Sequence, residues 1–276
     1  MLNVRGERIG NNIKLVAIDI DGTLVDNDRN ISSRNKEAIR SLRDIGVEVT
    51  LATGRMFDSA KVYADELELN LPLVTYQGAL VKVSATGEIL YERYVDASLA
   101  QQVVALAADK GFRAWFYLND RVLVDKITPE TREYAAKYRV PVCAVDSLAD
   151  YAQLSPLKLI VPDYNEESLT RFELESKEAF GSSLHIARSL PQYLEFGHPE
   201  ATKAKGIDAV VRYLGISPQE VMAIGDSWND LEMLEYAGIA VVMGNARDDI
   251  KEKADYVTLS NQDHGVAAAL EKLLLL

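Results

Sequence analysis

The sequence predicts an α/β fold in which a Rossmann-like, doubly wound parallel sheet is interrupted by an inserted α+β domain. Short apolar segments alternate with helical segments near both ends of the 276-residue chain, as in β-α-β units. Polar residues follow directly after several of these apolar segments, where the strands of such a sheet end. The middle of the chain instead combines paired short strands with helices, which is typical of an α+β domain.

The first third of the chain contains alternating strands and helices. Residues 15–18 form a segment rich in Val and Ile, as expected for a parallel strand that is buried on both faces. The next helix follows the capping residues Ser32 and Ser33 and ends at Gly46. In order, we expect a strand at 15–18, a helix at 34–45, a strand at 47–52, a helix at 56–67 and a strand at 73–75. Residues 1–13 are polar and rich in Gly and Asn, and we expect a loose lead-in or an extra edge segment there.

Hairpins distinguish the middle of the chain from its ends. There we expect a hairpin of 81–83 and 88–95, a helix at 97–110, a hairpin of 112–118 and 121–125, helices at 129–138 and 166–180, and strands at 157–161, 184–187 and 192–196. Alternation resumes near residue 200, with helices at 203–213, 231–236, 248–253 and 266–274 and strands at 221–224, 239–242 and 256–258. The pattern predicts two domains: a core of residues 1–82 and 197–276, and an inserted cap of residues 83–196.

Composition limits the possible partners and locations. The net charge of −12 repels polyanions, which argues against binding to nucleic acid or to an acidic membrane surface. A small anionic substrate would need local cations or a metal ion. Cys143 is the only cysteine, which excludes an intrachain disulfide. No apolar segment approaches the ~18 residues of a membrane span, and the first residues do not resemble a signal peptide. We therefore expect a cytoplasmic monomer or small homo-oligomer.

Polar residues collect at the ends of three predicted strands. Asp19 and Asp21 follow the first strand, and side-chain alternation places both on the same side. Thr53-Gly54-Arg55 follows the second strand, and Asp226, Asn229 and Asp230 follow the strand at 221–224. Lys203 begins the helix just before that strand. Because the carboxyl ends of parallel strands share one edge of a sheet, we expect these residues to share one crevice.

This combination of residues suggests a particular chemistry. Taken alone, the Asp-x-Asp-Gly-Thr of residues 19–23 could be a polar strand end and a turn, and it does not fit an EF-hand loop. Together, the carboxylates, a hydroxyl, a glycine-flanked backbone and an ammonium group describe a site for Mg²⁺-dependent phosphoryl transfer. The cation and the lysine would offset the repulsion between a phosphate ester and an aspartate nucleophile.

The same residues resemble a known family. Asp19-Ile-Asp21-Gly-Thr23, Thr53-Gly-Arg55, Lys203 and Gly225-Asp226-x-x-Asn229-Asp230 occur in the order of the four motifs of the haloacid dehalogenase superfamily. The resemblance covers nearly the whole chain and is to the Cof-type sugar-phosphatase branch, whose α/β cap lies between the second and third motifs. Each motif alone is weak evidence, whereas the ordered set is highly specific.

The resemblance also implies a role for each site residue. It implies that Asp19 is the nucleophile, that Asp21 is the general acid and base, and that Thr53 and Lys203 hold and neutralise the phosphate. It implies substrate or phosphate contacts from Gly54, Arg55, Gln77, Gly78 and Asn229. It implies a Mg²⁺ ion bound by the Asp19 carboxylate, the Asp21 carbonyl and Asp226, with Asp230 supporting these ligands.

Three features depart from the family pattern. Gln77-Gly78 stands where the family usually has Asn-Gly. Lys203 is followed by Ala204 and not by glycine, so Lys205 remains a competitor for the role of the phosphate-binding lysine. The lead-in before the first strand is also longer than usual. For Arg55, a contact with substrate and a pairing with a carboxylate are equally compatible with the sequence.

We therefore predict a Mg²⁺-dependent phosphatase that hydrolyses a small phosphorylated metabolite, such as a sugar phosphate, through an aspartyl-phosphate. One alternative is a phosphomutase or phosphotransferase on the same core, in which a second hydroxyl accepts the phosphoryl group. Two alternatives are not enzymes: a phospho-accepting receiver, which also pairs an aspartate with Mg²⁺, and a silent sugar-phosphate binder. The large insertion and the presence of Asp21 favour turnover.

Overall fold

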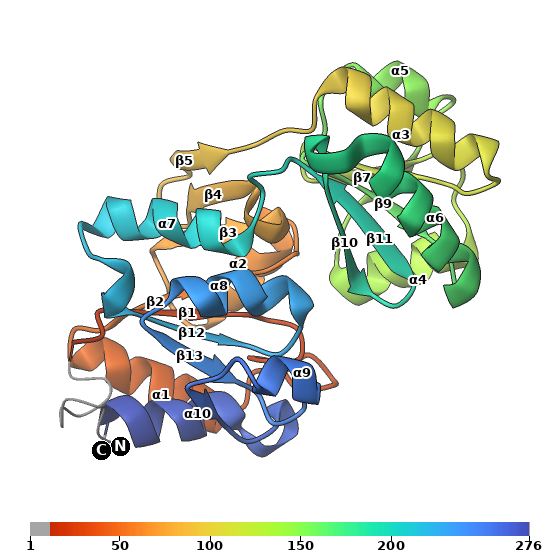
Figure 1. Ribbon diagram of the computed structural model, residues 1–276. Helices are drawn as coiled ribbons and strands as arrows, with labels where there is room; N and C mark the ends of the chain where they lie inside the picture. The colour runs from red at the N-terminus through yellow and green to blue at the C-terminus, as the bar shows by residue number, and fades with distance from the viewer. Residues whose placement is uncertain (1–11, 276) are drawn as a thin grey trace.

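The computed structural model describes residues 12–275, which form a core and a cap (Figure 1). Most of the predicted lead-in at residues 1–13 therefore lies outside the described residues. The main sheet of the core has five parallel strands in the order β14-β13-β12-β1-β2. These strands are β1 (Leu15–Ile18), β2 (Glu48–Leu51), β12 (Val221–Gly225), β13 (Ile239–Val242) and β14 (Tyr256–Val257). A parallel bridge between Ala52 and Val74 places β3 (Pro72–Thr75) beside β2.

Helices cover both faces of this sheet, as predicted for a doubly wound fold. Val16 and Ile18 of β1 face α1 (Ser33–Asp44), α2 (Phe57–Glu66) and α10 (Gly265–Leu270), with which they share one hydrophobic cluster. Leu15 and Ala17 belong to a second cluster on the opposite face. That cluster includes residues of α7 (Lys203–Leu214), α8 (Leu231–Tyr236) and α9 (Asp248–Lys251). A π-helical turn, Glu271–Leu275, extends α10.

A small antiparallel sheet, β3-β4-β5, leads from the core toward the cap. The predicted domain boundary at residue 82 falls inside β4 (Leu80–Val83), and β5 (Ile89–Glu92) pairs with β4. A cut at residue 82 would divide this sheet, because backbone hydrogen bonds join its strands on both sides of the cut. We therefore propose that the cap begins near residue 94 and that the core resumes after β11.

The cap contains a six-stranded sheet in the order β10-β11-β9-β6-β7-β8. Its strands are β6 (Trp115–Leu118), β7 (Arg121–Val124), β8 (Val142–Ala144), β9 (Lys158–Pro162), β10 (His185–Leu190) and β11 (Tyr193–Gly197). Its helices are α3 (Ala97–Asp109), α4 (Pro129–Tyr138), α5 (Leu148–Ala152) and α6 (Glu166–Phe180). Neither β8 nor α5 was predicted, because they are three and five residues long and too short for a clear periodicity.

The two faces of the cap sheet have different neighbours. Phe116 and Leu159 share a cluster with residues of α3 and α6 on one face. Trp115, Ile160 and Tyr193 belong to the hydrophobic cluster that includes core residues. This second face, together with α4, is therefore the one that the cap presents to the core. Within residues 12–275, no helix has the length and hydropathy needed to cross a membrane.

Candidate active site

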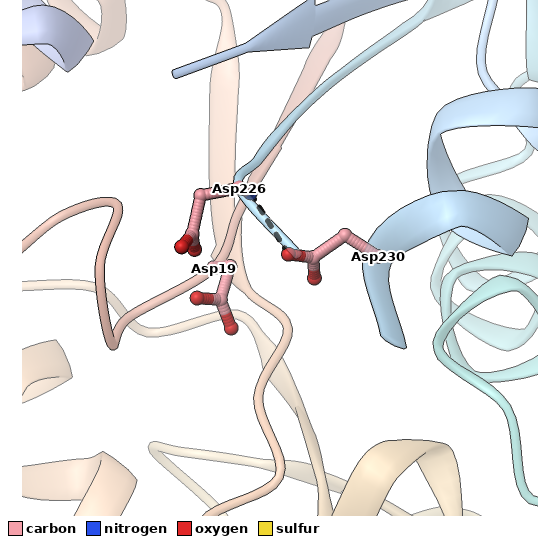
Figure 2. Close-up of side chains that lie close together, drawn as sticks. All are labelled: Asp19, Asp226 and Asp230. Carbon is pink, nitrogen blue, oxygen red and sulfur yellow. Dashed lines mark hydrogen bonds between the residues drawn. The ribbon is translucent and has the colours of Figure 1, made fainter. Parts of the chain in front are cut away.

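The strand ends bring the predicted carboxylates together. Asp19 follows β1 and Asp226 follows β12, and the two strands are paired in register, with Ile18 beside Ile224. Oxygen atoms of Asp19, Asp226 and Asp230 all lie within 4.8 Å of one another (Figure 2). Asp19, Asp21, Thr53 and Asp226 line a single cavity of about 160 Å³ between the core and the cap.

Lys203 is the lysine that reaches these carboxylates. It is the first residue of α7, and its Nζ lies 2.5 Å from Oδ1 of Asp19 and 2.6 Å from Oδ1 of Asp230. Burial alone would lower the pKa of Lys203, but the negative charges of Asp19 and Asp230 outweigh it and raise this pKa. Lys205, the competitor left open by the sequence, is exposed.

Asp230 holds the cluster together and is poorly placed to bind an ion itself. Its Oδ2 accepts the backbone N–H of Asp226 at 2.9 Å (Figure 2). The same oxygen accepts the backbone N–H of Ser227 at 3.0 Å, and Oδ1 accepts the hydrogen bond from Lys203. Both carboxylate oxygens are therefore already engaged. This arrangement needs a glycine at position 225, because a Cβ there would lie 2.6 Å from the Cβ of Asp230.

Thr23 fixes Asp226 in a way that the sequence analysis did not foresee. Its hydroxyl donates to Oδ1 of Asp226 at 3.0 Å, and within the described chain Oδ2 of Asp226 accepts no hydrogen bond. Burial and the charge of Asp230 raise the pKa of Asp226 to about 7. Burial also raises the pKa of Asp19 well above its ordinary value, although Lys203 opposes this. The neighbouring groups therefore do not fully offset the negative charge of the carboxylate cluster.

A magnesium ion fits this excess of negative charge. Mg²⁺ prefers a few carboxylate oxygens in an otherwise hydrated shell. Within residues 12–275, Oδ2 of Asp19 and Oδ2 of Asp226 are the cluster oxygens without a hydrogen-bond donor. The donor set is therefore chemically suitable for the predicted ion, and its carboxylates lie close enough together to share it.

Arg55 is paired with Asp21. Its Nε and Nη2 each lie 2.7 Å from one oxygen of the Asp21 carboxylate, which is a bidentate ion pair. The guanidinium carbon also lies 4.9 Å from the ring centroid of Tyr63 and 5.6 Å from that of Tyr138, a residue of the cap. Burial raises the pKa of Asp21, but the hydrogen bonds and charge of Arg55 outweigh it and leave this pKa below its ordinary value.

Thr53, Gly54, Gln77 and Asn229 form a polar part of the cavity wall. The Thr53 hydroxyl oxygen accepts the backbone N–H of Arg55 at 3.2 Å, so its proton is free to be donated elsewhere. The Asn229 amide donates to Oε1 of Gln77 at 3.1 Å. Gln77 lies against Gly54, where a Cβ would approach the Gln77 amide nitrogen to 2.6 Å. Gln77 thus occupies space that only a glycine at position 54 leaves open.

Gly78, for which a substrate or phosphate contact was predicted, does not line the cavity. It is buried, is absent from the cavity wall, and has a φ of +96°, a conformation that favours glycine. It packs directly against the backbone carbonyl of Thr202, which leaves no room for a side chain. Because Thr202 caps the helix that begins with Lys203, Gly78 positions that lysine and does not contact the cavity.

The sequence patterns did not reveal the cap residues of the cavity wall, which include Tyr134, Tyr138, Lys158, Tyr193 and Glu195. One signal was present in the sequence. Lys158 and Glu195 are charged residues inside otherwise apolar strands, where a charge needs a partner or a function. The tyrosines carried no comparable signal, because aromatic residues in a cap are more often part of its core.

Comparison with known proteins identifies the family. A family model described as haloacid dehalogenase-like hydrolase matches residues 16–270. The chain belongs to the haloacid dehalogenase superfamily. Among relatives, YxeH of Bacillus subtilis (strain 168) is 31% identical over 275 residues, covering 95% of this chain and 98% of that protein. The 5-amino-6-(5-phospho-D-ribitylamino)uracil phosphatase YcsE of the same organism is 30% identical over 263 residues, covering 95% and 96% of the two chains.

Solved structures of haloacid dehalogenase-like proteins share the fold. One such hydrolase from Bacteroides thetaiotaomicron has a TM-score of 0.86 at 27% identity, covering 95% of this chain and all of its own. The haloacid dehalogenase subclass IIB sugar phosphatase BT4131 has a TM-score of 0.80 at 26% identity, covering 94% of this chain and 98% of that one. The predicted family with its Cof-type branch, the fold class and the assignment as a phosphatase are confirmed. The roles of individual residues stay predictions.

Proposed function

We propose that this phosphatase is Mg²⁺-dependent and hydrolyses small phosphorylated metabolites, sugar phosphates among them, through an aspartyl-phosphate on Asp19. The observation that carries the proposal is the environment of Asp19. Its carboxylate is held by Lys203 at 2.5 Å, lies beside Asp226, and lines the cavity between core and cap. An aspartate placed in this way can act as a nucleophile toward phosphorus once the opposing charges are offset.

The first half of the proposed reaction forms the aspartyl-phosphate. A carboxylate oxygen of Asp19 forms a bond to phosphorus while the bond from phosphorus to the leaving alcohol breaks, and protonated Asp21 gives its proton to the leaving oxygen. In this step, the Lys203 ammonium group beside Asp19 and the Thr53 hydroxyl in the cavity wall would bind the negative phosphoryl oxygens. Bound Mg²⁺ would be held by Asp19, Asp226 and the Asp21 carbonyl and would offset the charge shared by phosphate and carboxylates.

The second half regenerates the enzyme. Asp21, now ionised, takes a proton from water, whose oxygen attacks phosphorus and displaces Asp19 to give inorganic phosphate. The bidentate pair with Arg55 suits this base form, because it lowers the pKa of Asp21. Acting as an acid requires Asp21 to leave Arg55 and take up a proton. We therefore propose that this pairing opens and closes once in each turnover.

The relatives support a small metabolite as the substrate. BT4131 is a sugar phosphatase, and YcsE acts on a phosphorylated ribityl compound. A cavity that lies between core and cap and is lined by aromatic residues of the cap suits a small molecule better than a phosphoprotein.

A phosphate-release screen tests the proposal. The purified protein is incubated with a panel of sugar, polyol, nucleotide and cofactor phosphates and with 4-nitrophenyl phosphate, with Mg²⁺ or with EDTA. We expect phosphate release that requires Mg²⁺ and is greatest for a sugar or polyol phosphate. Transfer of the phosphoryl group to a second sugar without phosphate release would favour the phosphomutase or phosphotransferase alternative. A stable phospho-Asp19 without turnover would favour a receiver.

A further inference from the structure

A buried ion pair in the cap forms part of the active-site wall. Nζ of Lys158, on β9, lies 3.0 Å from Oε2 of Glu195, on β11, and the two side chains are 5% and 10% exposed. The same ammonium group donates to the backbone carbonyl of Gly54 at 3.0 Å, so it also joins the cap to the phosphate-binding loop of the core. It lies 4.8 Å from the ring centroid of Tyr117. Lys158 is therefore fully engaged by groups of the protein.

Glu195, by contrast, keeps one carboxylate oxygen available. Oε2 accepts the hydrogen bond from Lys158, whereas Oε1 has no donor among the residues that the structure describes. Glu195 borders both the cavity that contains Asp19 and an adjoining cavity of about 360 Å³ that contains Lys203 and Trp228. A leaving group bound next to the phosphate therefore meets a carboxylate oxygen that can accept a hydrogen bond and cannot donate one.

The cations around these cavities are already paired. In the described part of the chain, the Lys and Arg side chains that line the first cavity are Arg55, bound to Asp21, and Lys158, bound to Glu195. Those that line the second are Lys203, bound to Asp19 and Asp230, and Lys177 and Arg188, which share Glu173. A second anionic group on the substrate would meet carboxylates there without an unpaired Lys or Arg.

We infer that Glu195 determines specificity for the leaving group. It accepts a hydrogen bond from a hydroxyl group of the leaving alcohol, and its negative charge opposes leaving alcohols that carry a second anion. Lys158 acts as a positioning residue, because it holds the Glu195 carboxylate and ties it to Gly54. The inference rests on the proposed phosphatase function and adds to it a residue that selects hydroxyl-bearing leaving alcohols without a second negative charge.

Two aryl phosphates isolate this effect. 4-(Hydroxymethyl)phenyl phosphate and 4-carboxyphenyl phosphate have similar shapes but carry a hydroxyl group or a carboxylate opposite the phosphate. We expect the wild-type enzyme to hydrolyse the hydroxymethyl compound with the higher kcat/KM. In Glu195→Gln, the ratio of the two kcat/KM values should fall by about tenfold, which corresponds to the loss of one hydrogen bond to a charged group. Part of the fall should be a gain in kcat/KM on the carboxylate compound, which a purely structural role would not produce.

Glu175→Gln is the matched control. Glu175 is an exposed cap residue whose Oε2 lies 2.8 Å from Nζ of Lys110, so its loss removes the same charge away from both cavities. It should leave the ratio of the two kcat/KM values unchanged. An unchanged ratio in Glu195→Gln would overturn the inference while leaving the phosphatase proposal intact. A wild-type preference for the carboxylate compound would also overturn the inference, and this measurement does not depend on the folding of a variant. Failure to hydrolyse any phosphate ester with Mg²⁺ would instead refute the proposed function, and the inference with it.

Discussion

The guanidinium group of Arg55 binds both carboxylate oxygens of Asp21 at 2.7 Å, and it lies beside two tyrosine rings, one from the core and one from the cap. This pairing connects Asp21, the proposed general acid and base, to the cap. Burial opposes ionisation of Asp21, but Arg55 outweighs it and lowers the pKa of this carboxyl group, so in the proposed mechanism Arg55 would control the proton of Asp21.

Asp21→Asn should slow turnover by about 10²–10⁴, the usual loss when general acid and base assistance is removed. The loss should be greater for alkyl phosphates than for 4-nitrophenyl phosphate, because nitrophenolate leaves without needing a proton. Steady-state rates on both substrates measure this. Equal rates for variant and wild type would remove Asp21 from the mechanism.

Arg55→Lys should move the acidic limb of the pH–rate profile to higher pH. Arg55 lowers the pKa of Asp21, so losing the bidentate contact raises this pKa, while burial continues to favour the protonated form. With 4-nitrophenyl phosphate, Asp21 is needed only as a base in the second half-reaction. The rate should therefore fall off at a higher pH in the variant, as measured by kcat between about pH 4 and pH 8. If the acidic limb of the Arg55→Lys profile stays at the wild-type pH, Arg55 does not control the protonation of Asp21.

Lys203→Met should abolish activity and destabilise the fold, because it leaves the carboxylates of Asp19 and Asp230 buried without their cation. Removing one member of a buried ion pair typically costs roughly 3–5 kcal/mol. Lys205→Met, at an exposed position two residues along the same helix, is the control and should keep both activity and stability. Thermal unfolding and phosphate release distinguish the two. If Lys205→Met loses activity while Lys203→Met keeps it, Lys205 is the phosphate-binding lysine.

Asp226→Asn should stabilise the metal-free protein at neutral pH and remove its stabilisation by Mg²⁺. The pKa of Asp226 is raised to about 7 in the folded chain, from an ordinary 3.8, so the folded state binds this proton more tightly than the unfolded state does. Its contribution to the stability of the metal-free protein therefore falls as the pH rises from about 4 to about 7. Asparagine lacks this charge. Thermal unfolding in EDTA and in excess Mg²⁺, at about pH 5 and pH 8, measures both effects. An undiminished Mg²⁺ shift in the variant would rule out Asp226 as a ligand.

The convergence of the active-site residues could be predicted because it depends on strand ends. Asp19, Thr53 and Asp226 each follow an apolar strand, and parallel strands place their carboxyl ends at one edge whatever the details of packing. The helices and strands of the core could be predicted because their hydrophobic periodicity is strong. The hairpin of β4 and β5 was also predicted, but the sequence did not show that β3 pairs with β4 and so joins this hairpin to the core.

The contacts inside the site could not be read from the sequence, because they depend on how side chains from different strands and loops meet. The sequence left Arg55 free to bind either a substrate or a carboxylate, and only the geometry pairs it with Asp21. Gly78 belongs to a polar turn that looked like part of the phosphate site, but its positive φ and its packing on Thr202 give it a positioning role. Lys158 and Glu195 lie far from the motifs along the chain, and their meeting depends on the alignment of two antiparallel strands.

Phosphate release by Asp19→Asn tests the central claim most directly. The substitution keeps the size of the side chain and removes the nucleophilic carboxylate, so the variant should fold, as judged by circular dichroism and thermal unfolding. With Mg²⁺ and 4-nitrophenyl phosphate, we expect the wild type to release phosphate and Asp19→Asn to release none above background. Mg²⁺-dependent release by folded Asp19→Asn at the wild-type rate would contradict the account.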